Sequence, residues 1–193
     1  MLVEGVGIND ATYQVVYHER VGKKWKIIDR CPYYSRWAGM LRRCYGRGIP
    51  KSYNGCSVCE EWLTFSTFKT WMEKQDWEGK ELDKDLLVFG NRAYSPTTCI
   101  FVSREVNMFL VSDRLGSDRT LPIGVSFEAY TGKYRAVIAE SGKYKNLGRF
   151  LTPDEAKIAW LNRKGELALS LAEKETDEVI INALKARYVI GNF

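Results

Sequence analysis

The sequence has no long apolar run: no stretch approaches the about 18–20 consecutive apolar residues that a membrane-spanning helix needs. The first ten residues include Glu4 and Asp10 and lack the basic start and apolar stretch of a secretory signal. We therefore expect a cytoplasmic protein with no membrane partner. Its five cysteines are expected to be free thiols or metal ligands rather than disulfides, because cytosolic thiols are kept reduced.

The excess of positive over negative charge is also small. The chain has 29 lysines and arginines against 24 aspartates and glutamates, which leaves a formal net charge of +5. A surplus of this size is compatible with a polyanionic partner such as nucleic acid but does not require one. Hydrophobic residues make up 45% and charged residues 27% of the chain, which favours a folded protein of one or two domains.

Two helices with aromatic faces are predicted in the first part of the chain. Two short candidate strands precede these helices, on either side of a glycine turn: Tyr13–Tyr17 and Trp25–Ile28. The next two segments have apolar residues at three- and four-residue steps, the spacing of one helix face. The first face consists of Tyr34, Trp37, Met40, Leu41 and Cys44, and the second of Trp62, Phe65, Phe68, Trp71 and Met72. Large rings dominate core burial, so we expect both faces in the core.

The middle of the chain is predicted to run strand, loop, strand, helix. Leu82–Val88 alternates imperfectly and ends at a Phe-Gly-Asn turn, and Cys99–Val102 is a short apolar strand. Ser103 is a favourable N-cap for a helix that starts at Arg104. Residues 112–120, with a glycine and several charges, are expected to be a linker.

The clearest pattern lies after residue 120. The expected strands are Ile123–Tyr130, Lys133–Glu140 and Lys143–Phe150, separated by Thr-Gly and Ser-Gly turns. Thr152 then begins a helix, because Pro153 suits the first helical position and Glu155 completes a capping box. A second helix, about 173–188, is expected to pack on the domain or to contact another copy of the chain.

This last region carries four short motifs in a fixed order. They are Ile123-Gly124-Val125, Gly132-Lys133-Tyr134-Arg135-Ala136-Val137-Ile138, Leu147-Gly148-Arg149-Phe150 and Thr152-Pro153-Asp154-Glu155-Ala156. With one motif for each element, the region resembles the AP2 DNA-binding domain of plant transcription factors and of many phage and mobile-element proteins. The resemblance implies a three-stranded antiparallel sheet backed by one helix, with the other side of the sheet in the major groove of double-stranded DNA.

The two-residue period of a strand assigns two faces to the middle strand of this sheet. Tyr134, Ala136 and Ile138 share one face and are expected to pack on the helix, so that Lys133 and Arg135 point toward DNA. The resemblance adds Ser126, Glu128, Tyr144 and Asn146 to the DNA-facing side. Candidates for phosphate contacts are Lys143, Lys145 and Arg149. The plant proteins carry more arginines in the first strand, so their sequence preference is not carried over.

A second set of motifs lies before the linker. It consists of Trp37, Met40, Arg43-Cys44-Tyr45, Val58-Cys59-Glu60-Glu61-Trp62, Phe65, Phe68, Trp71, Leu82-Asp83-Lys84-Asp85, Gly90-Asn91, Tyr94-Ser95-Pro96-Thr97-Thr98-Cys99 and Asn107. With these motifs, the chain after Cys31 resembles phage HNH-type homing endonucleases that join a nuclease region to an AP2 domain. The resemblance implies a ββα element that binds one divalent ion, Mg²⁺ or Mn²⁺, with Asp83 and Asn107 as ligands and Asn91 as an orienting residue.

One position departs from the HNH pattern. Such sites use a histidine beside the aspartate as general base, because the pKa of histidine suits deprotonation of water at neutral pH. Here that position is Lys84, and the single histidine, His18, lies far upstream. Lysine is a poor base unless burial lowers its pKa by several units. Three interpretations stay open: a metal-bound hydroxide with Lys84 as electrostatic helper, a catalytically inactive DNA-binding protein, and a mere surface cluster of charges at Asp83, Lys84 and Asp85.

The cysteines offer a structural zinc site as a further hypothesis. Cys56 and Cys59 form half of such a site, and Cys31 and Cys44 could complete a tetrahedral set. The spacing between the pairs is irregular, and no second short-spaced pair exists. Buried free thiols are the alternative, because free cysteine is among the most buried residue types. Cys99 is expected in the core.

The sequence thus predicts an α+β fold in four parts. These are an HNH-like or degenerate nuclease region over residues 1–111, a linker over 112–120, an AP2-like DNA-binding domain over 121–172 and a C-terminal helix over 173–193. The predicted function is metal-dependent nicking or cleavage of double-stranded DNA, and a non-catalytic DNA-binding or regulatory protein is the alternative. A protein that blocks a host enzyme is a third hypothesis, for which the sequence gives no positive sign. If a phage encodes the chain, its compartment is the bacterial cytoplasm.

Overall fold

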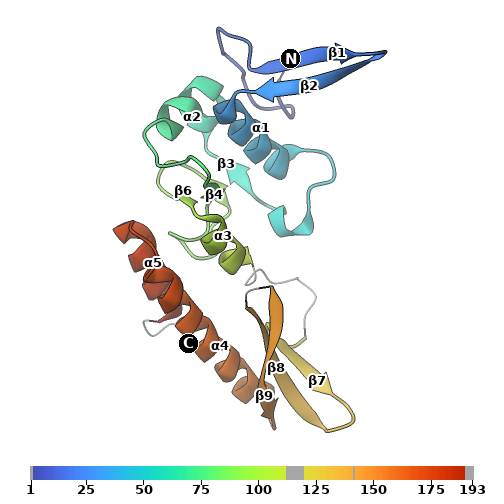
Figure 1. Ribbon diagram of the computed structural model, residues 1–193, viewed down its shortest axis with the longest axis vertical. Helices are drawn as coiled ribbons and strands as arrows, with labels where there is room; N and C mark the ends of the chain where they lie inside the picture. The colour runs from blue at the N-terminus through green and yellow to red at the C-terminus, as the bar shows by residue number, and fades with distance from the viewer. Residues whose placement is uncertain (1, 112–119, 141, 190–193) are drawn as a thin grey trace. The chain divides into compact units, whose positions relative to one another are not determined.

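The computed structural model describes residues 2–111, 120–140 and 142–189, so the predicted linker lies almost entirely outside the described residues. The chain forms two compact units, Met1–Arg104 and Glu105–Phe193. Both combine helices with small sheets, which confirms the predicted α+β class (Figure 1). None of the described helices is long and apolar enough to span a bilayer.

The first unit contains a two-stranded antiparallel hairpin, β1 (Val16–Val21) and β2 (Lys24–Arg30). Gly22 in its turn has a φ of +64°, a left-handed conformation that glycine adopts without strain. The hairpin was expected, but its first strand begins at Val16 rather than at Tyr13. Both strands also extend further toward the turn than predicted, because β1 continues to Val21 and β2 begins at Lys24.

The aromatic face of α1 (Pro32–Tyr45) forms the centre of the first core. Its buried residues are Trp37, Met40, Leu41 and Cys44, which confirms the predicted helix face. The indole Nε1 of Trp37 donates a hydrogen bond to the carbonyl oxygen of Trp62 at 2.7 Å. A buried ring with a polar N–H needs such an acceptor, and here the bond ties α1 to the segment that precedes the next helix.

The second predicted helix is divided in two. Glu60–Leu63 forms a short 3₁₀ turn, and α2 (Phe65–Met72) begins only after Thr64, whose backbone is extended. The cause is a distant segment, because the backbone of Ile8 forms hydrogen bonds on both sides of Thr64. The expected apolar face is nevertheless buried, with Trp71 half-buried: Trp62, Phe65, Phe68, Trp71 and Met72.

The middle of the chain has the predicted order of strand, loop, strand and helix. β4 (Glu81–Asp83) pairs antiparallel with β6 (Ile100–Val102), and α3 (Arg104–Val111) follows. A further short strand, β5 (Ala93–Tyr94), lies in the loop and pairs in parallel with β3 (Ser57–Val58). β4 is shorter than predicted, because the chain turns at its last residue. The division between the two units falls at the start of α3.

The second unit contains a three-stranded antiparallel sheet in the order β7–β8–β9. Its strands are β7 (Val125–Glu128), β8 (Lys133–Glu140) and β9 (Lys143–Phe150); the last two have the predicted bounds and the first is shorter. α4 (Pro153–Ala172) packs across one side of this sheet (Figure 1). The hydroxyl of Thr152 accepts the backbone N–H of Glu155, whose carboxylate accepts the N–H of Thr152, so the predicted capping box is confirmed.

The last helix, α5 (Glu178–Tyr188), lies along α4 and buries Ile180, Leu184 and Tyr188. It begins later than predicted, because the carboxylate of Asp177 accepts a backbone N–H of the first turn at 2.8 Å and caps the helix there. Lys164 of α4 is also buried. Its Nζ donates to the carbonyl oxygen of Phe109 at 2.7 Å and lies 3.6 Å from the centroid of that ring, which attaches α3 to α4.

Candidate functional site

The three-stranded sheet turns one side to α4 and leaves the other side uncovered. Ala136 and Ile138 of β8 are buried under α4, at 0% and 3% exposure, and Tyr134 is half-buried on the same side. Side chains alternate along a strand, so Lys133 and Arg135 point away from the helix. Lys133 is exposed, and the side chain of Arg135 is 43% exposed. The two faces of β8 are therefore as predicted.

Cross-strand pairing extends the uncovered side over all three strands, because directly paired residues of an antiparallel sheet lie on the same side. The pairs are Ser126 and Arg149 with Arg135, Glu128 with Lys133, Tyr144 with Ala139, and Asn146 with Val137. We call its seven polar residues the outer face: Ser126, Glu128, Lys133, Arg135, Tyr144, Asn146 and Arg149. All seven were named from the sequence, and the fold places them on one surface.

Arg149 reaches the outer face because of a bulge in β9. Ala136 pairs with Gly148, but the next residue, Val137, pairs with Asn146, so Leu147 is the extra residue. A strict two-residue alternation from Asn146 would have pointed Arg149 toward α4. The extra residue reverses the alternation and places Arg149 opposite Arg135.

Lys143 and Lys145, the other candidates for phosphate contacts, lie on the helix side of the sheet. Lys145 pairs with the buried Ile138, and Lys143 pairs with Glu140. The Nζ of Lys145 lies 3.7 Å from the carboxylate of Glu140, which also forms an ion pair with Arg163 of α4. These two lysines and the outer face therefore point to opposite sides of the sheet.

Glu128 lies between the two arginines of the outer face. Its Oε2 is 2.6 Å from Nε of Arg149, and its Oε1 is 3.4 Å from Nε of Arg135. Arg149 also donates a hydrogen bond to the hydroxyl of Tyr130 at 3.2 Å. The pKa of Glu128 is lowered, chiefly by its hydrogen bond with Arg149, and the same bond raises the pKa of Arg149. One carboxylate thus offsets part of the charge of two arginines.

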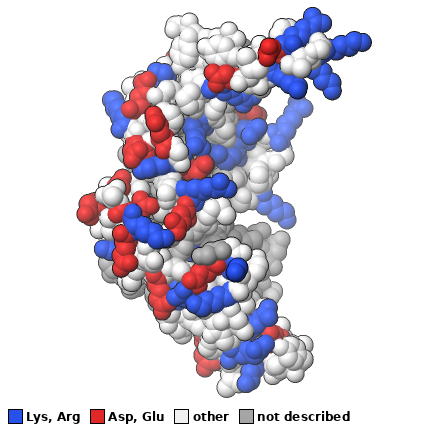
Figure 2. All heavy atoms as spheres, in the orientation of Figure 1, with Lys and Arg blue, Asp and Glu red and all other residues white. Residues whose placement is uncertain are grey.

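Exposed aromatic rings accompany these cations. The ring of Tyr144 is 86% exposed and that of Tyr130 is 79% exposed. In Figure 2 blue lysine and arginine side chains lie over the sheet of the second unit and over the hairpin β1–β2 of the first. Cations can contact phosphates, a guanidinium can form two hydrogen bonds with guanine, and exposed rings can pack on bases. The residue types of the outer face fit nucleic acid in all three respects.

A second polar cluster lies where β4 ends. Asp83 is 2% exposed, and its Oδ1 accepts the backbone N–H groups of Asp85 and Leu86 at 2.8 and 2.7 Å. The carboxylate therefore fixes the tight turn that ends the strand. Lys84 is 5% exposed. Because Asp83 and Lys84 are both buried, the interpretation of this segment as a surface cluster of charges is wrong.

Lys84 and Asn91 form hydrogen bonds within the loop that follows β4. The Nζ of Lys84 pairs with the carboxylate of Asp85 and donates to the carbonyl oxygen of Asn91 at 3.1 Å. The amide of Asn91 donates to the carbonyl oxygens of Lys84 and Ala93, at 2.8 and 2.7 Å, and accepts the N–H of Ala93. Lys84 is thus engaged in the loop as a hydrogen-bond donor to two acceptors.

The fold brings Asp83, Lys84 and Asn91 together in the first unit. Asn107, the other expected metal ligand, lies on α3 within the residues assigned to the second unit. Among the described residues, no group of three or more His, Cys, Asp or Glu side chains is placed to hold a metal ion. The two expected ligands, Asp83 and Asn107, thus belong to different units.

The four cysteines do not form one zinc site. Cys31 directly precedes α1 and Cys44 lies in its last turn, so the two are about 20 Å apart at a rise of 1.5 Å per residue. A single ion with bonds of about 2.3 Å cannot reach both thiolates. Burial raises the pKa of the Cys44 thiol to about 11 and that of Cys99 to about 12. Both are neutral thiols in the core, as expected for Cys99.

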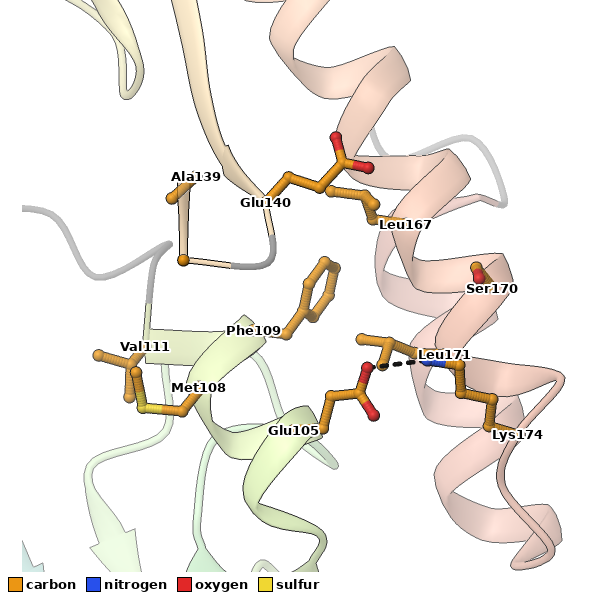
Figure 3. A pocket seen from close by; sticks show the side chains of 11 residues that line it. Glu105, Met108, Phe109, Val111, Ala139, Glu140, Leu167, Ser170, Leu171 and Lys174 are labelled. Carbon is orange, nitrogen blue, oxygen red and sulfur yellow. Dashed lines mark hydrogen bonds and ion pairs between the residues drawn. The ribbon is translucent and has the colours of Figure 1, made fainter. Parts of the chain in front are cut away.

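A hollow of about 500 Å³ lies elsewhere in the second unit, between α3, the β8–β9 turn and α4 (Figure 3). Its walls are mainly apolar and include Met108, Val111 and Leu171. An ion pair of 2.9 Å between Glu105 and Lys174 lies across it, as the dashed line shows. The hollow shares no residue with the outer face.

Sequence reasoning missed Tyr130 and the pairing of Glu128 with two arginines. The place of Tyr130 just before a Thr-Gly turn was a usable sign of an exposed ring, but the pairing depends on the bulge in β9, which no local pattern indicates. No protein-family model matches the chain, and neither a curated protein nor a solved structure matches it.

Proposed function

We propose that the chain binds double-stranded DNA through the outer face of β7–β9, in the manner of the AP2-type domain that its sequence resembles. The observation that carries the proposal is the division of β8 into two faces. Ala136 and Ile138 are buried under α4, whereas Lys133 and Arg135 point away from it, with Arg149 beside them. Several cations on one solvent-exposed surface are what a polyanion requires.

A small antiparallel sheet with cations on adjacent strands is compatible with binding in the major groove. That groove is about 12 Å wide and admits strands as well as helices. Arg135 and Arg149 lie opposite each other on adjacent strands, so both can approach base edges or phosphates from one side. Glu128 holds them in place before binding, because both guanidinium groups pair with its carboxylate. On DNA, one or both would exchange this carboxylate for a phosphate or a guanine.

DNA cleavage is the second candidate, favoured by the strand–strand–helix order of β4, β6 and α3 with Asp83 at the end of the first strand. The contacts of Asp83 and Lys84 speak against a Mg²⁺ or Mn²⁺ site, however. Asp83 is buried and uses Oδ1 to hold its own turn, and Lys84 stands where the HNH pattern has histidine and is engaged by two acceptors. DNA binding without cleavage is therefore the function that the geometry supports best.

The binding proposal is tested with a labelled DNA duplex and the full-length chain. Fluorescence anisotropy over a series of salt concentrations gives both the affinity and its salt dependence. The double variant Lys133→Gln with Arg135→Gln should lower the affinity about tenfold or more and reduce the salt slope by about 2, since each lost phosphate contact removes about 0.9. The matched control carries Lys157→Gln and Lys185→Gln, two exposed lysines of α4 and α5, and should bind like the wild type. Equal binding by both double variants would overturn the proposal.

The cleavage alternative is tested separately on supercoiled plasmid with Mg²⁺ and with Mn²⁺. We expect DNA to be bound and left intact. Nicking by the wild type that disappears in Asp83→Ala, with binding retained, would establish the endonuclease instead. Because binding and nicking are measured on the same preparations, a chain that fails to fold would be recognised by its loss of binding.

A further inference from the structure

The β1–β2 hairpin exposes more apolar surface than a freestanding element normally does. Every residue of β2 is exposed, and β1 is exposed except at its first residue. Trp25 is 68% exposed, Ile27 48% and Ile28 60%. An isolated two-stranded hairpin is marginally stable in water, and large apolar side chains at its surface mark an interaction site more often than a structural need.

The charge of the hairpin identifies the kind of partner. Between Val16 and Arg30 there are five lysines and arginines but only two carboxylates, Glu19 and Asp29. The surplus of cations in so short a segment is large for a chain whose overall charge is only +5. An acidic partner is therefore favoured, and a neutral apolar surface is not.

The pairing register separates the two faces of the hairpin. Arg20 pairs with Trp25, His18 with Ile27 and Val16 with Arg30, so these six residues share one face. Neither carboxylate lies on it. Glu19 and Asp29 lie on the opposite face, where Glu19 is paired with Lys26. One side of the ribbon therefore combines two arginines, the only histidine and an exposed indole ring without a competing acid.

We propose that the hairpin is a second DNA-contacting surface, with Arg20, Lys23 and Arg30 on phosphates and Trp25 packed on sugar or base. The inference rests on the proposed function and extends it to the first unit. A two-stranded ribbon is narrow enough for the major groove, and its cations contact the backbone without reading sequence. Indole rings stack on bases or enter base steps in DNA-binding proteins of several kinds.

The test compares two triple variants of the full-length chain on one duplex of about 40 base pairs, long enough for more than one contact. The hairpin variant carries Arg20→Gln, Lys23→Gln and Arg30→Gln, which remove the three cations assigned to phosphates, all of them exposed and outside the core. The control variant carries Lys74→Gln, Lys157→Gln and Lys185→Gln, which remove the same charge from exposed positions elsewhere. We expect the hairpin variant to bind at least about tenfold more weakly, with a salt slope smaller by about 2–3, and the control to match the wild type.

Trp25 supplies an independent readout. It is the most exposed of the six tryptophans, so the emission that Trp25→Phe removes reports on the hairpin. DNA should quench this component and protect it from acrylamide. A large change in the wild type that is absent in Trp25→Phe supports the proposal, and no change in the wild type contradicts it.

Failure of this inference is distinguishable from failure of the proposed function. If wild type binds DNA, the outer-face variant loses binding, and the hairpin variant matches its control with no change at Trp25, the hairpin is not a DNA contact. If the wild type does not bind DNA at all, the proposed function and this inference are both wrong. Hairpin-dependent binding to anionic phospholipid vesicles but not to DNA, or self-association that the hairpin variant lacks, would overturn the proposal in favour of those partners.

Discussion

Glu128 is the residue whose removal should strengthen DNA binding. It pairs with Arg135 and Arg149, so part of their positive charge is already offset before DNA arrives. Glu128→Gln keeps the size of the side chain and removes the negative charge. We expect its affinity for duplex DNA to rise about three- to tenfold in anisotropy titrations, with a salt slope steeper by about 1. The gain should shrink as salt screens the phosphates.

The pH dependence of this effect follows from the lowered pKa of Glu128, which Arg149 causes. The unfolded pKa of this carboxyl group is near 4.5, and above that pH its ion pairs contribute their full stability. The contribution is lost as the pH falls through the lower pKa of the folded state. Between about pH 6 and pH 8 the group stays ionised, so the ratio of variant to wild-type affinity should be constant. Glu173→Gln, at an exposed position away from the sheet, controls for the change in net charge. An equal gain in this control would contradict a local role for Glu128.

Gly124 is a position where both backbone and packing require glycine. Its φ is +72°, and a Cβ there would lie 2.1 Å from Cδ1 of Trp160 and 2.7 Å from the carbonyl oxygen of Val137. Gly124→Ala should lower the free energy of unfolding by about 2–4 kcal/mol, from left-handed strain and overpacking together. Urea denaturation followed by tryptophan fluorescence measures the loss.

Gly132→Ala is the matched control for that measurement. Its φ is +68°, but a Cβ at Gly132 would meet nothing within 4 Å. This variant should therefore lose only the strain, about 1 kcal/mol. Equal losses for the two variants would show that the contact between Gly124 and Trp160 is not a packing constraint.

At the scale of the element, the loop between β4 and β5 depends on one amide. Asn91 makes two donor bonds and one acceptor bond to the loop backbone, and it shares the loop with the buried Lys84. Asn91→Ala should cost about 2–3 kcal/mol in urea denaturation, because several backbone groups lose their partner at once. Asn162→Ala, at an exposed position of α4, should change stability by less than about 0.5 kcal/mol. A loss below about 1 kcal/mol for Asn91→Ala would mean that water replaces the amide.

Elements set by neighbouring residues were predicted from the sequence, whereas elements set by distant residues were not. Local patterns predict three of these elements: alternating side chains and the Thr-Gly and Ser-Gly turns predict β8 and β9, and a capping box predicts the start of α4. The gap before α2 exists because Ile8 pairs on both sides of Thr64, and no residue near position 64 encodes that contact. Helix propensity yields to such a long-range pairing.

The same distinction applies to the candidate site. The two-residue period of β8 was enough to place Lys133 and Arg135 outward, because that strand alternates regularly up to Ala136. The position of Arg149 depends on the bulge at Leu147, and the burial of Asp83 depends on a turn that its own carboxylate stabilises. Residue types therefore indicated which side chains carry charge, but the register decided which of them share a surface.

At the scale of the whole molecule, the modest net charge conceals an uneven distribution. The hairpin has five cations and two carboxylates, and the outer face has three cations and one carboxylate. Their surpluses of three and two together equal the formal net charge of +5, so the rest of the chain is balanced. A protein can therefore present two strongly basic surfaces while its overall composition looks ordinary.

Buried thiols should make the folded chain sensitive to alkali. The pKa of Cys99 rises to about 12 because burial disfavours the thiolate, and that of Cys44 rises to about 11 for the same reason, whereas an unfolded thiol titrates near 9.0. A group with a raised folded pKa contributes its full stability below the unfolded value. The contribution is lost as the pH rises from there through the folded value, because only the unfolded state releases the proton.

Urea denaturation at several pH values between about 8 and 11 measures this dependence. Above pH 9 the Cys99 thiol alone should lower the free energy of unfolding by about 1.4 kcal/mol for each pH unit, as an upper value for a buried group. Cys99→Ala lowers stability at every pH by leaving a small cavity, but its slope above pH 9 should be shallower than that of the wild type by about that amount. Comparing slopes separates titration from packing. Parallel slopes for the two proteins would show that the Cys99 side chain is not shielded from water in the folded chain.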